Sequence, residues 1–281
     1  MFSVNARATI QGTVHQCRGI DFFALCNIVL GRNVEMSKQK QSHVNSFNFQ
    51  PGRVIAGKYE VLSLLGSGWE GEVYRVRERN TGVDRAAKVF FPQRNKHDRA
   101  TKFYARKLHK LRHCSILIQY HTQERITFHR ELTTILISEY VEGELLSHFI
   151  ARQRGQRLTI FEGLHLLHAL AAGLEEIHRA REYHGDLHDD NILVKRQGLT
   201  FKVKIVDMYN WGAPDAGNIR DDVCDLIRLF YDAIGGARFY HKHPREIKEI
   251  CCGLKRSLII RKYRTAGHIR QYLESMKWYG D

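Results

Sequence analysis

Residues 184–194 read His184-Gly185-Asp186-Leu187-His188-Asp189-Asp190-Asn191-Ile192-Leu193-Val194, and the rest of the chain can be placed relative to this motif. It follows a long helical pattern and runs into an apolar stretch typical of a strand. Asp186 and Asn191 stand five residues apart in the loop. A carboxylate there can act as a general base, and an amide oxygen can bind Mg²⁺. A polar turn with capping carboxylates is the alternative, but acids this close repel one another unless a cation is present. The motif therefore favours a catalytic and metal-binding loop.

A further carboxylate ends the strand that follows the loop. The stretch Val203-Lys204-Ile205-Val206-Asp207 is strand-like, and Asp207 closes it. A carboxylate in this place can chelate a metal ion that bridges two phosphates. Because aspartate also commonly starts turns, Asp207 indicates a metal site only together with the preceding loop.

A glycine-rich turn lies far upstream, in Leu65-Gly66-Ser67-Gly68-Trp69-Glu70-Gly71-Glu72-Val73-Tyr74. Its three glycines have no side chain, so the backbone can close over phosphates and offer its N–H groups. A dinucleotide-binding turn would need a helix after the third glycine, whereas a strand-like stretch follows here. The pattern therefore favours a phosphate-binding turn between two strands.

One lysine interrupts an apolar strand downstream of the glycines. Lys88 lies in Ala86-Ala87-Lys88-Val89. A buried ammonium group is costly unless it meets an anion, and nucleotide phosphates are such an anion. A lysine on an edge strand that reaches solvent is the alternative. The glycine-rich turn upstream favours the phosphate-binding interpretation.

The order of the expected strands and helices indicates two lobes of different secondary structure. Strands come first in the chain and helices follow, which favours a β-rich lobe followed by an α-rich lobe. The apolar periodicity predicts strands over 59–65, 72–77, 86–91, 116–121, 125–128 and 133–138, and helices over 98–113, 143–153, 159–181, 222–234, 245–258 and 265–275.

Taken in order, these motifs resemble the signature set of the protein kinase superfamily, over about residues 53–275. The His-Gly-Asp form of the loop resembles that of aminoglycoside- and choline-type kinases and of several atypical or bacterial kinases. Taken together, the motifs resemble a compact serine/threonine kinase of bacterial, bacterial-effector or atypical type. The resemblance implies an α+β, two-lobed fold, with a β-rich N-lobe at 53–138 and a hinge and mainly α-helical C-lobe at 139–281. It also implies ATP and Mg²⁺ as cofactors.

The resemblance assigns roles to single residues. Asp186 would be the catalytic base, and Lys88 would hold the α- and β-phosphates. His188 replaces the lysine that commonly touches the transferring phosphate, and Asn191 and Asp207 would bind the metal. The residues implied to enclose the nucleotide are Gly66, Ser67, Gly68, Gly71, Val73, Ala86, Lys88, Glu139, Val141, Glu144 and Leu193.

The sequence departs from the family pattern at the partner of Lys88. The helix over 98–113 should carry a glutamate that pairs with this lysine, but alignment places Tyr104 there. Glu124, Glu70 and Glu72 remain as possible substitutes.

The segment after the catalytic motifs also differs from the family pattern. Asp207-Met208-Tyr209 replaces Asp-Phe-Gly, and only fourteen residues separate Asp207 from Asp222. Asp222 matches the family's buried aspartate that braces the catalytic loop. The short segment truncates the platform on which a peptide substrate would dock.

The leading function is transfer of the γ-phosphoryl group of ATP to a serine or threonine hydroxyl of a protein. A small-molecule kinase of the aminoglycoside, choline or sugar type and a weakly active pseudokinase scaffold are the alternatives. The net charge of +14 favours polyanionic partners in general. Lys102, Arg106 and Lys110 line one helix face, but no nucleic-acid module accompanies them, so a solvated face is preferred and nucleic acid is not expected as a partner.

Residues 1–52 are expected to be a poorly ordered extension, with Met36 as a candidate translation start. The apolar run at 22–30 is too short to span a bilayer, and a peripheral membrane anchor is the weaker interpretation of it. The six cysteines are scattered without a paired motif, as in a reducing compartment. A cytoplasmic location is expected, or a host cytosol if the protein is an effector.

Overall fold

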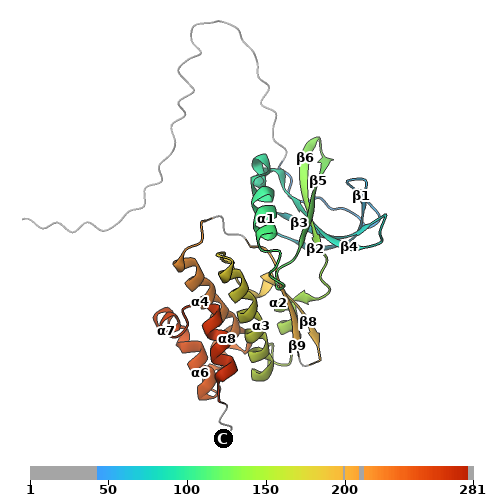
Figure 1. Ribbon diagram of the computed structural model, residues 1–281. Coiled ribbons are helices and arrows are strands. Elements are labelled where there is room, and N and C mark those ends of the chain that lie inside the picture. The colour runs from blue at the N-terminus through green and yellow to red at the C-terminus, as the bar shows by residue number, and fades with distance from the viewer. Residues whose placement is uncertain (1–42, 199, 209–211, 278–281) are drawn as a thin grey trace, which may run out of the picture. The chain divides into compact units, whose positions relative to one another are not determined.

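The structure, a computed structural model, describes residues 43–198, 200–208 and 212–277. The N-lobe is built on one antiparallel sheet in the order β1-β2-β3-β4-β6-β5 (Figure 1). The strands predicted over 59–65, 72–77, 86–91 and 133–138 are confirmed. The bounds are β1 Val54–Ile55, β2 Tyr59–Ser67, β3 Gly71–Glu78, β4 Asp84–Phe90, β5 Tyr120–Phe128 and β6 Glu131–Glu139.

The segment before β5 differs from the expectation. The sequence predicts separate strands over 116–121 and 125–128, but β5 is one strand that begins at Tyr120. Leu117 makes a single parallel bridge with Ile205 instead. Polar residues in β5 alternate with apolar ones because one face of this edge strand stays accessible, and this alternation obscures its continuity in the sequence.

The two faces of the N-lobe sheet bury different partners, as β4 shows. Successive side chains of a strand point to opposite faces. Ala87 and Val89 are fully buried in the core cluster on one face. Phe90 belongs to a separate cluster on the other face, where it packs with Tyr104 of helix α1 (Arg99–Lys110). Lys88 shares the face of Phe90 and therefore points toward α1.

Residues 43–50 cover the face of the sheet opposite α1, and we call them the N-terminal strap. Phe47 and Phe49 are 3% and 4% exposed. The ring of Phe47 stacks on Phe91 with centroids 5.3 Å apart and meets the edge of Phe128 at 5.0 Å. The expectation of a poorly ordered extension up to residue 52 is therefore wrong for 43–52, because these aromatic side chains complete the core. The part of that prediction concerning residues 1–42, including Met36, lies outside the described residues.

The C-lobe is organised around helix α3 (Ile160–Arg179), which packs against α4 and α8 (Figure 1). Thr159 caps α3: its hydroxyl accepts from the Glu162 backbone N–H, and the Glu162 carboxylate accepts from the Thr159 N–H. The remaining elements are α2 Leu146–Ala151, α4 Ala216–Ala233, α5 Gly236–Tyr240, α6 Arg245–Cys251, α7 Arg256–Lys262, α8 Ala266–Ser275, and a sheet of β7 Glu144–Leu145, β8 Ile192–Gln197 and β9 Thr200–Ile205.

Three predicted helices have different bounds, although those over 159–181 and 265–275 are confirmed. The helix predicted over 245–258 is two helices, because the backbone turns left-handed at Cys252 and Gly253, with φ of 50° and 58°. The helix over 143–153 is replaced by β7 and the short α2. Helix α4 begins before residue 222, since Asp215 and Asn218 cap it reciprocally.

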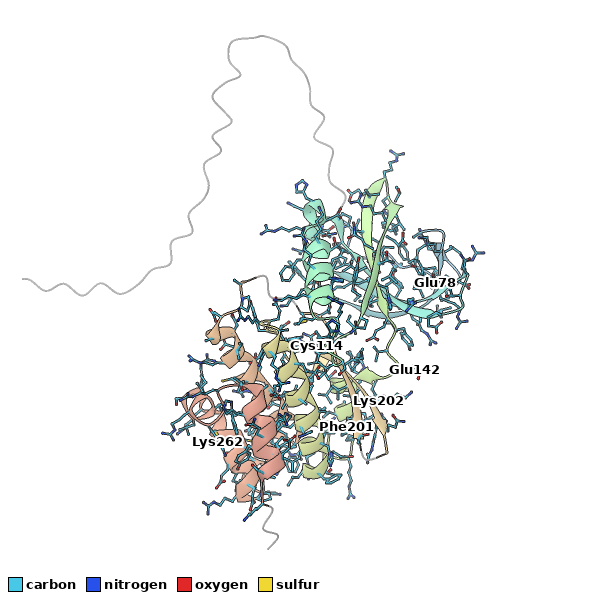
Figure 2. All side chains as sticks on the ribbon, viewed as in Figure 1. Glu78, Cys114, Glu142, Phe201, Lys202 and Lys262 are labelled. Atoms are coloured by element: carbon cyan, nitrogen blue, oxygen red, sulfur yellow. The ribbon has the colours of Figure 1, made fainter. Side chains whose placement is uncertain are left out.

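The end of α1 and the chain that follows it belong to the core of the C-lobe. Leu108, Leu111 and Cys114 are buried in the same cluster as α3. Figure 2 labels Cys114 where the chain passes between the two lobes. Helix α1 therefore contacts the N-lobe sheet along one stretch and the C-lobe core at its end. None of the helices in the described ranges is long and apolar enough to cross a bilayer.

Candidate active site

The strand register gathers several predicted site residues on the α1 face of the sheet. Val73 of β3 is paired directly with Lys88 of β4, and Ala86 is paired with Ser138 of β6. Directly paired residues share a face, and so do residues two apart along one strand. Val73, Ala86 and Lys88 therefore lie together, beside a small cavity bounded by Lys88, Tyr104, Ser138 and Asp207 among others.

Lys88 is held between two carboxylates. Its Nζ lies 2.8 Å from Glu70 Oε2 and 2.7 Å from Asp207 Oδ1. Burial by itself lowers the pKa of this ammonium group, but Asp207, Tyr104 and Glu70 outweigh burial and raise the pKa above its usual value. Lys88 is therefore a fixed cation.

Glu70 takes the place of the missing helix glutamate. It comes from the glycine loop (residues 66–71), and its Oε2 also accepts a hydrogen bond of 3.1 Å from the Tyr104 hydroxyl on α1. The loop can bend this far because Gly71 lies against β4: a Cβ there would fall 2.0 Å from the Val89 carbonyl oxygen. Of the other candidates, Glu124 pairs with Lys58 at 2.8 Å.

The other glutamate of this region, Glu72, points to the opposite face of the sheet. It is 3% exposed. Its carboxylate accepts from the Ser46 hydroxyl at 2.7 Å, from the Phe47 N–H at 3.1 Å, and from the Tyr74 hydroxyl. Glu72 thus fixes the N-terminal strap, a role that the sequence analysis missed because the strap was assigned to the extension.

Gly66 and Gly68 are not required by close packing in the way that Gly71 is. A Cβ on either would meet no atom within 4 Å, and neither has a positive φ. Their lack of a side chain leaves open space along the loop where the backbone can approach a phosphate, with Ser67 between them.

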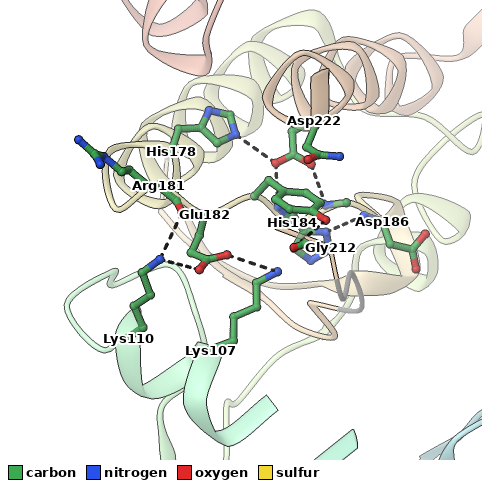
Figure 3. Close-up of polar contacts among 12 residues, drawn as sticks. Lys107, Lys110, His178, Arg181, Glu182, His184, Asp186, Gly212 and Asp222 are labelled. Carbon is green, nitrogen blue, oxygen red and sulfur yellow. Dashed lines mark hydrogen bonds and ion pairs between the residues drawn. The ribbon is translucent and has the colours of Figure 1, made fainter. Parts of the chain in front are cut away.

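The catalytic loop (residues 184–191) is braced by a buried carboxylate, as the sequence predicts. Asp222 of α4 is fully buried, and it accepts from the backbone N–H groups of His184 at 2.7 Å and Gly185 at 2.8 Å. His178 Nε2 lies 3.1 Å from the same carboxylate (Figure 3). Gly185 has a φ of 84°, so the glycine suits a left-handed backbone that an arginine would adopt only with strain.

His184 joins the catalytic loop to the strand that leads to Asp207. Its Nε2 lies 3.0 Å from the Val206 carbonyl oxygen, and its Nδ1 accepts from the Asp186 N–H at 3.2 Å. Burial lowers the pKa of this imidazole, which is fully enclosed. A neutral ring is what this arrangement needs, because Nδ1 must remain an acceptor.

Asn191 links the predicted base and the predicted metal ligand. Its Nδ2 donates to the Asp186 carbonyl at 2.8 Å and lies 3.3 Å from Asp186 Oδ2 and 2.9 Å from His188 Nε2. The Val206 N–H bonds to the Asn191 carbonyl at 2.9 Å, which places Asp207 beside the loop. Lys88, Asp186, His188, Asn191 and Asp207 therefore form one connected site.

The predicted hinge, which begins at residue 139, and the residues near it that are implied to enclose the nucleotide make contacts within the protein. The Glu139 N–H donates to the Gln119 carbonyl at 2.9 Å, and the Glu139 carboxylate lies 2.5 Å from Lys204 Nζ. Glu144, which the resemblance places among the residues that enclose the nucleotide, is paired with Arg152. Leu193 lies opposite Leu145 in the β7–β8 ladder, and Val141 follows the end of β6.

A comparison with protein families accords with this geometry. The model of the protein kinase domain matches residues 59–211, which is more than half of the chain. The chain belongs to the protein kinase family. Members of this family use ATP with Mg²⁺.

Curated protein kinases resemble the chain at low identity. Aurora kinase of Schizosaccharomyces pombe is 28% identical over 175 residues, 61% of this chain and 46% of that kinase. Serine/threonine-protein kinase H1 of Homo sapiens is 28% identical over 156 residues, 54% of this chain and 34% of that kinase. Calcium-dependent protein kinase 4 of Plasmodium falciparum is 25% identical over 177 residues, which are 58% of this chain and 32% of that kinase. The matched part thus spans less than half the length of these kinases.

The donor set fits the magnesium ion that protein kinases use. The Asn191 amide nitrogen is engaged by Asp186, which orients the hard side-chain oxygen of Asn191 as the atom free to bind a cation. The Asp207 carboxylate is 45% exposed and so is accessible to one. Asn191 and Asp207 would hold the ion, which would neutralise charge on the phosphates of a bound nucleotide.

Proposed function

We propose that this kinase transfers the γ-phosphoryl group of MgATP to a serine or threonine hydroxyl of a protein. The observation that carries the proposal is the contact of Lys88 with Asp207, joined through Val206 and Asn191 to Asp186. Residues remote in the sequence thereby meet in one site. A base, a fixed cation and two oxygen donors for a metal are the groups that phosphoryl transfer needs.

Each residue has a distinct part in this proposal. Lys88 would bind the α- and β-phosphates, exchanging its contact with Asp207 for one with the nucleotide. Asp186 is 54% exposed, so its carboxylate can reach a substrate hydroxyl and accept its proton. His188 Nε2 lies 3.7 Å from Asp186 Oδ2, close enough to assist at the transferring phosphate. Catalysis would rest on positioning and electrostatic stabilisation.

Glu70 would position Lys88 in place of a helix glutamate. Tyr104 of helix α1 donates to the same carboxylate oxygen. The position of α1 would therefore still affect Lys88, through the Tyr104 hydroxyl and Glu70 instead of through a carboxylate on the helix. This substitution supports activity over the pseudokinase alternative, since the lysine retains an anionic partner whose side chain is 11% exposed.

Specificity for serine or threonine in a protein is supported by the names of the similar kinases, such as serine/threonine-protein kinase H1. A small-molecule hydroxyl is the second candidate. The observation that favours it is the cap of α4 at Asp215, which leaves only a short segment after Asp207 to hold a peptide. The cytoplasmic location stays a prediction.

Transfer from labelled ATP in the presence of Mg²⁺ tests the proposal, with generic protein substrates and small alcohols in parallel. We expect Asp186→Ala to lower transfer by about a hundredfold or more, the range of general-base catalysis, while nucleotide affinity stays within about twofold. Unchanged transfer in this variant would remove Asp186 as the base. Turnover of small alcohols without protein labelling would support the second candidate.

A further inference from the structure

A basic groove lies on the side of helix α1 away from the sheet. It has a volume of about 640 Å³, which is within the range of small-molecule sites. It runs along α1 and is bounded by Glu182, Gly212 and Pro214 of the C-lobe. Six cationic side chains line it and define what we call the α1 groove: Lys96, Arg99, Lys102, Arg106, Lys107 and Lys110.

The sequence of α1 produces this asymmetry. Ala100, Tyr104 and Leu108 recur every four residues and bury one face. Arg99, Lys102, Arg106 and Lys110 recur at intervals of three and four and share the other face. The helix contains no acidic residue between Arg99 and Lys110, so no neighbour within the helix compensates the charge.

Glu182 brings a carboxylate of the C-lobe to one end of the groove. Glu182 lies 2.6 Å from Lys110 Nζ and 3.9 Å from Lys107 Nζ (Figure 3). Lys102 donates to the His97 carbonyl at 3.2 Å. Across the described ranges 43–198, 200–208 and 212–277, no carboxylate forms an ion pair with Lys102 or Arg106. The groove therefore concentrates like charge that an anion would relieve.

Lys107 gives the groove a buried end. It is 6% exposed, and its ammonium group lies 4.8 Å from the ring centroid of Tyr183 and 5.7 Å from that of Phe103. Burial lowers the pKa of this ammonium group, and Glu182 opposes the effect. An additional anion at this end would further stabilise the charged form.

We propose that the α1 groove binds a compact, soluble molecule that carries several phosphate groups. Several cations converge on one concavity, so clustered phosphates match them better than a single carboxylate does. A concave site suits a small ligand, whereas a membrane surface or a nucleic-acid duplex would contact an extended or protruding face. The ligand would touch Lys107 and Lys110, the two cations that hold Glu182.

The position of Glu182 gives the groove a connection to the catalytic loop. Glu182 precedes His184 by two residues, and the His184 N–H is bonded to Asp222 (Figure 3). The His184 ring also contacts the Val206 carbonyl. A ligand in the groove therefore lies at the stem of the loop that carries Asp186. The site is separate from Lys88, so it does not depend on nucleotide transfer.

Calorimetric titration of the chain over residues 1–281 with inositol hexakisphosphate and with tripolyphosphate tests the proposal. We expect saturable binding that weakens as NaCl rises from about 50 to about 300 mM, because salt screens the attraction. The double variant Lys102→Glu/Arg106→Glu should bind about tenfold more weakly or worse. Thermal unfolding would verify that this variant remains folded.

The matched control reverses the same number of charges elsewhere. Arg228 of α4 and Arg261 of α7 are exposed, and Arg228→Glu/Arg261→Glu should leave affinity within about twofold. Equal weakening in both double variants would show a response to net charge alone and overturn the proposal. So would an absence of binding at low salt, or binding only to a phosphopeptide. Tighter binding to vesicles containing phosphatidylinositol bisphosphate than to its soluble headgroup would assign the groove to membranes instead.

Discussion

The glycine loop and the catalytic loop supply charged groups to the same site, but they are held in different ways. The catalytic loop is fixed within the C-lobe, where Asp222 binds two of its backbone N–H groups. The glycine loop is fixed through Glu70, by contacts with Lys88 of β4 and Tyr104 of α1. The ion-pair partner of a lysine can be supplied by more than one element of the fold. Here Glu70 of the glycine loop pairs with Lys88, in place of the glutamate that the family usually carries on the helix.

The largest expected effect concerns the brace of the catalytic loop. Asp222→Asn should lower the free energy of unfolding by about 3 kcal/mol, because an amide cannot accept from both buried N–H groups. Urea unfolding measures this change. Asp221→Asn is the matched control: Asp221 is 51% exposed and pairs with Arg256, so its loss should cost less than about 1 kcal/mol. Equal losses in both variants would contradict a brace specific to Asp222.

Substitution of Glu70 in the glycine loop should lower the activity of the kinase more than it lowers the stability of the fold. Glu70→Gln keeps an acceptor for Tyr104 but removes the charge beside Lys88. We expect kcat/KM for ATP to fall about tenfold, equivalent to about 1.4 kcal/mol, with partial recovery in Glu70→Asp. Steady-state transfer assays measure it.

Glu124→Gln is the control for the glycine-loop variant, since Glu124 pairs with a lysine whose side chain is 58% exposed. It should change kcat/KM by less than about twofold. The opposite result, with Glu124 needed and Glu70 dispensable, would show that the observed partner of Lys88 is not the functional one.

The smallest expected effect is a pH dependence of the free energy of unfolding that arises from Asp225, three residues after Asp222. Burial, with help from Asp222, Asp221 and Asp186, raises the pKa of Asp225 to about 6. A raised pKa means that the protonated form stabilises the fold, and that this contribution is lost as pH rises through about 6. Asp225→Asn should therefore be more stable than the parent at pH 8, by about 1 kcal/mol because solvent screens a partly buried group, and nearly equal to it at pH 4. Thermal unfolding across this range measures it, and a larger gain at pH 4 would refute the sign.

The sequence was most informative where a motif contains its own contacts. The roles of Asp186 and Asn191 could be proposed because a base and an oxygen ligand five residues apart in one loop must lie close together. The strand pattern likewise placed Lys88 correctly. Helix α3 could be predicted because its apolar period is regular and Thr159 caps it.

The sequence was least informative where contacts join distant segments. The sequence allowed three glutamates as the partner of Lys88. The close approach of Gly71 to β4, which the sequence does not reveal, brings Glu70 to this lysine. The division of the helix predicted over 245–258 depends on left-handed backbone at Cys252 and Gly253, which an apolar period does not reveal. The segment that contains Phe47 and Phe49 was assigned to a polar extension because asparagine and serine residues flank these two aromatic residues in the sequence.

The N-terminal strap has a practical consequence for where a recombinant domain should start. The family match begins at residue 59, yet Phe47 and Phe49 fill the outer face of the sheet from before that point. A fragment trimmed to the match would expose an aromatic patch and leave the Glu72 carboxylate without two of its donors. Soluble expression of this domain should therefore require a start at or before residue 43.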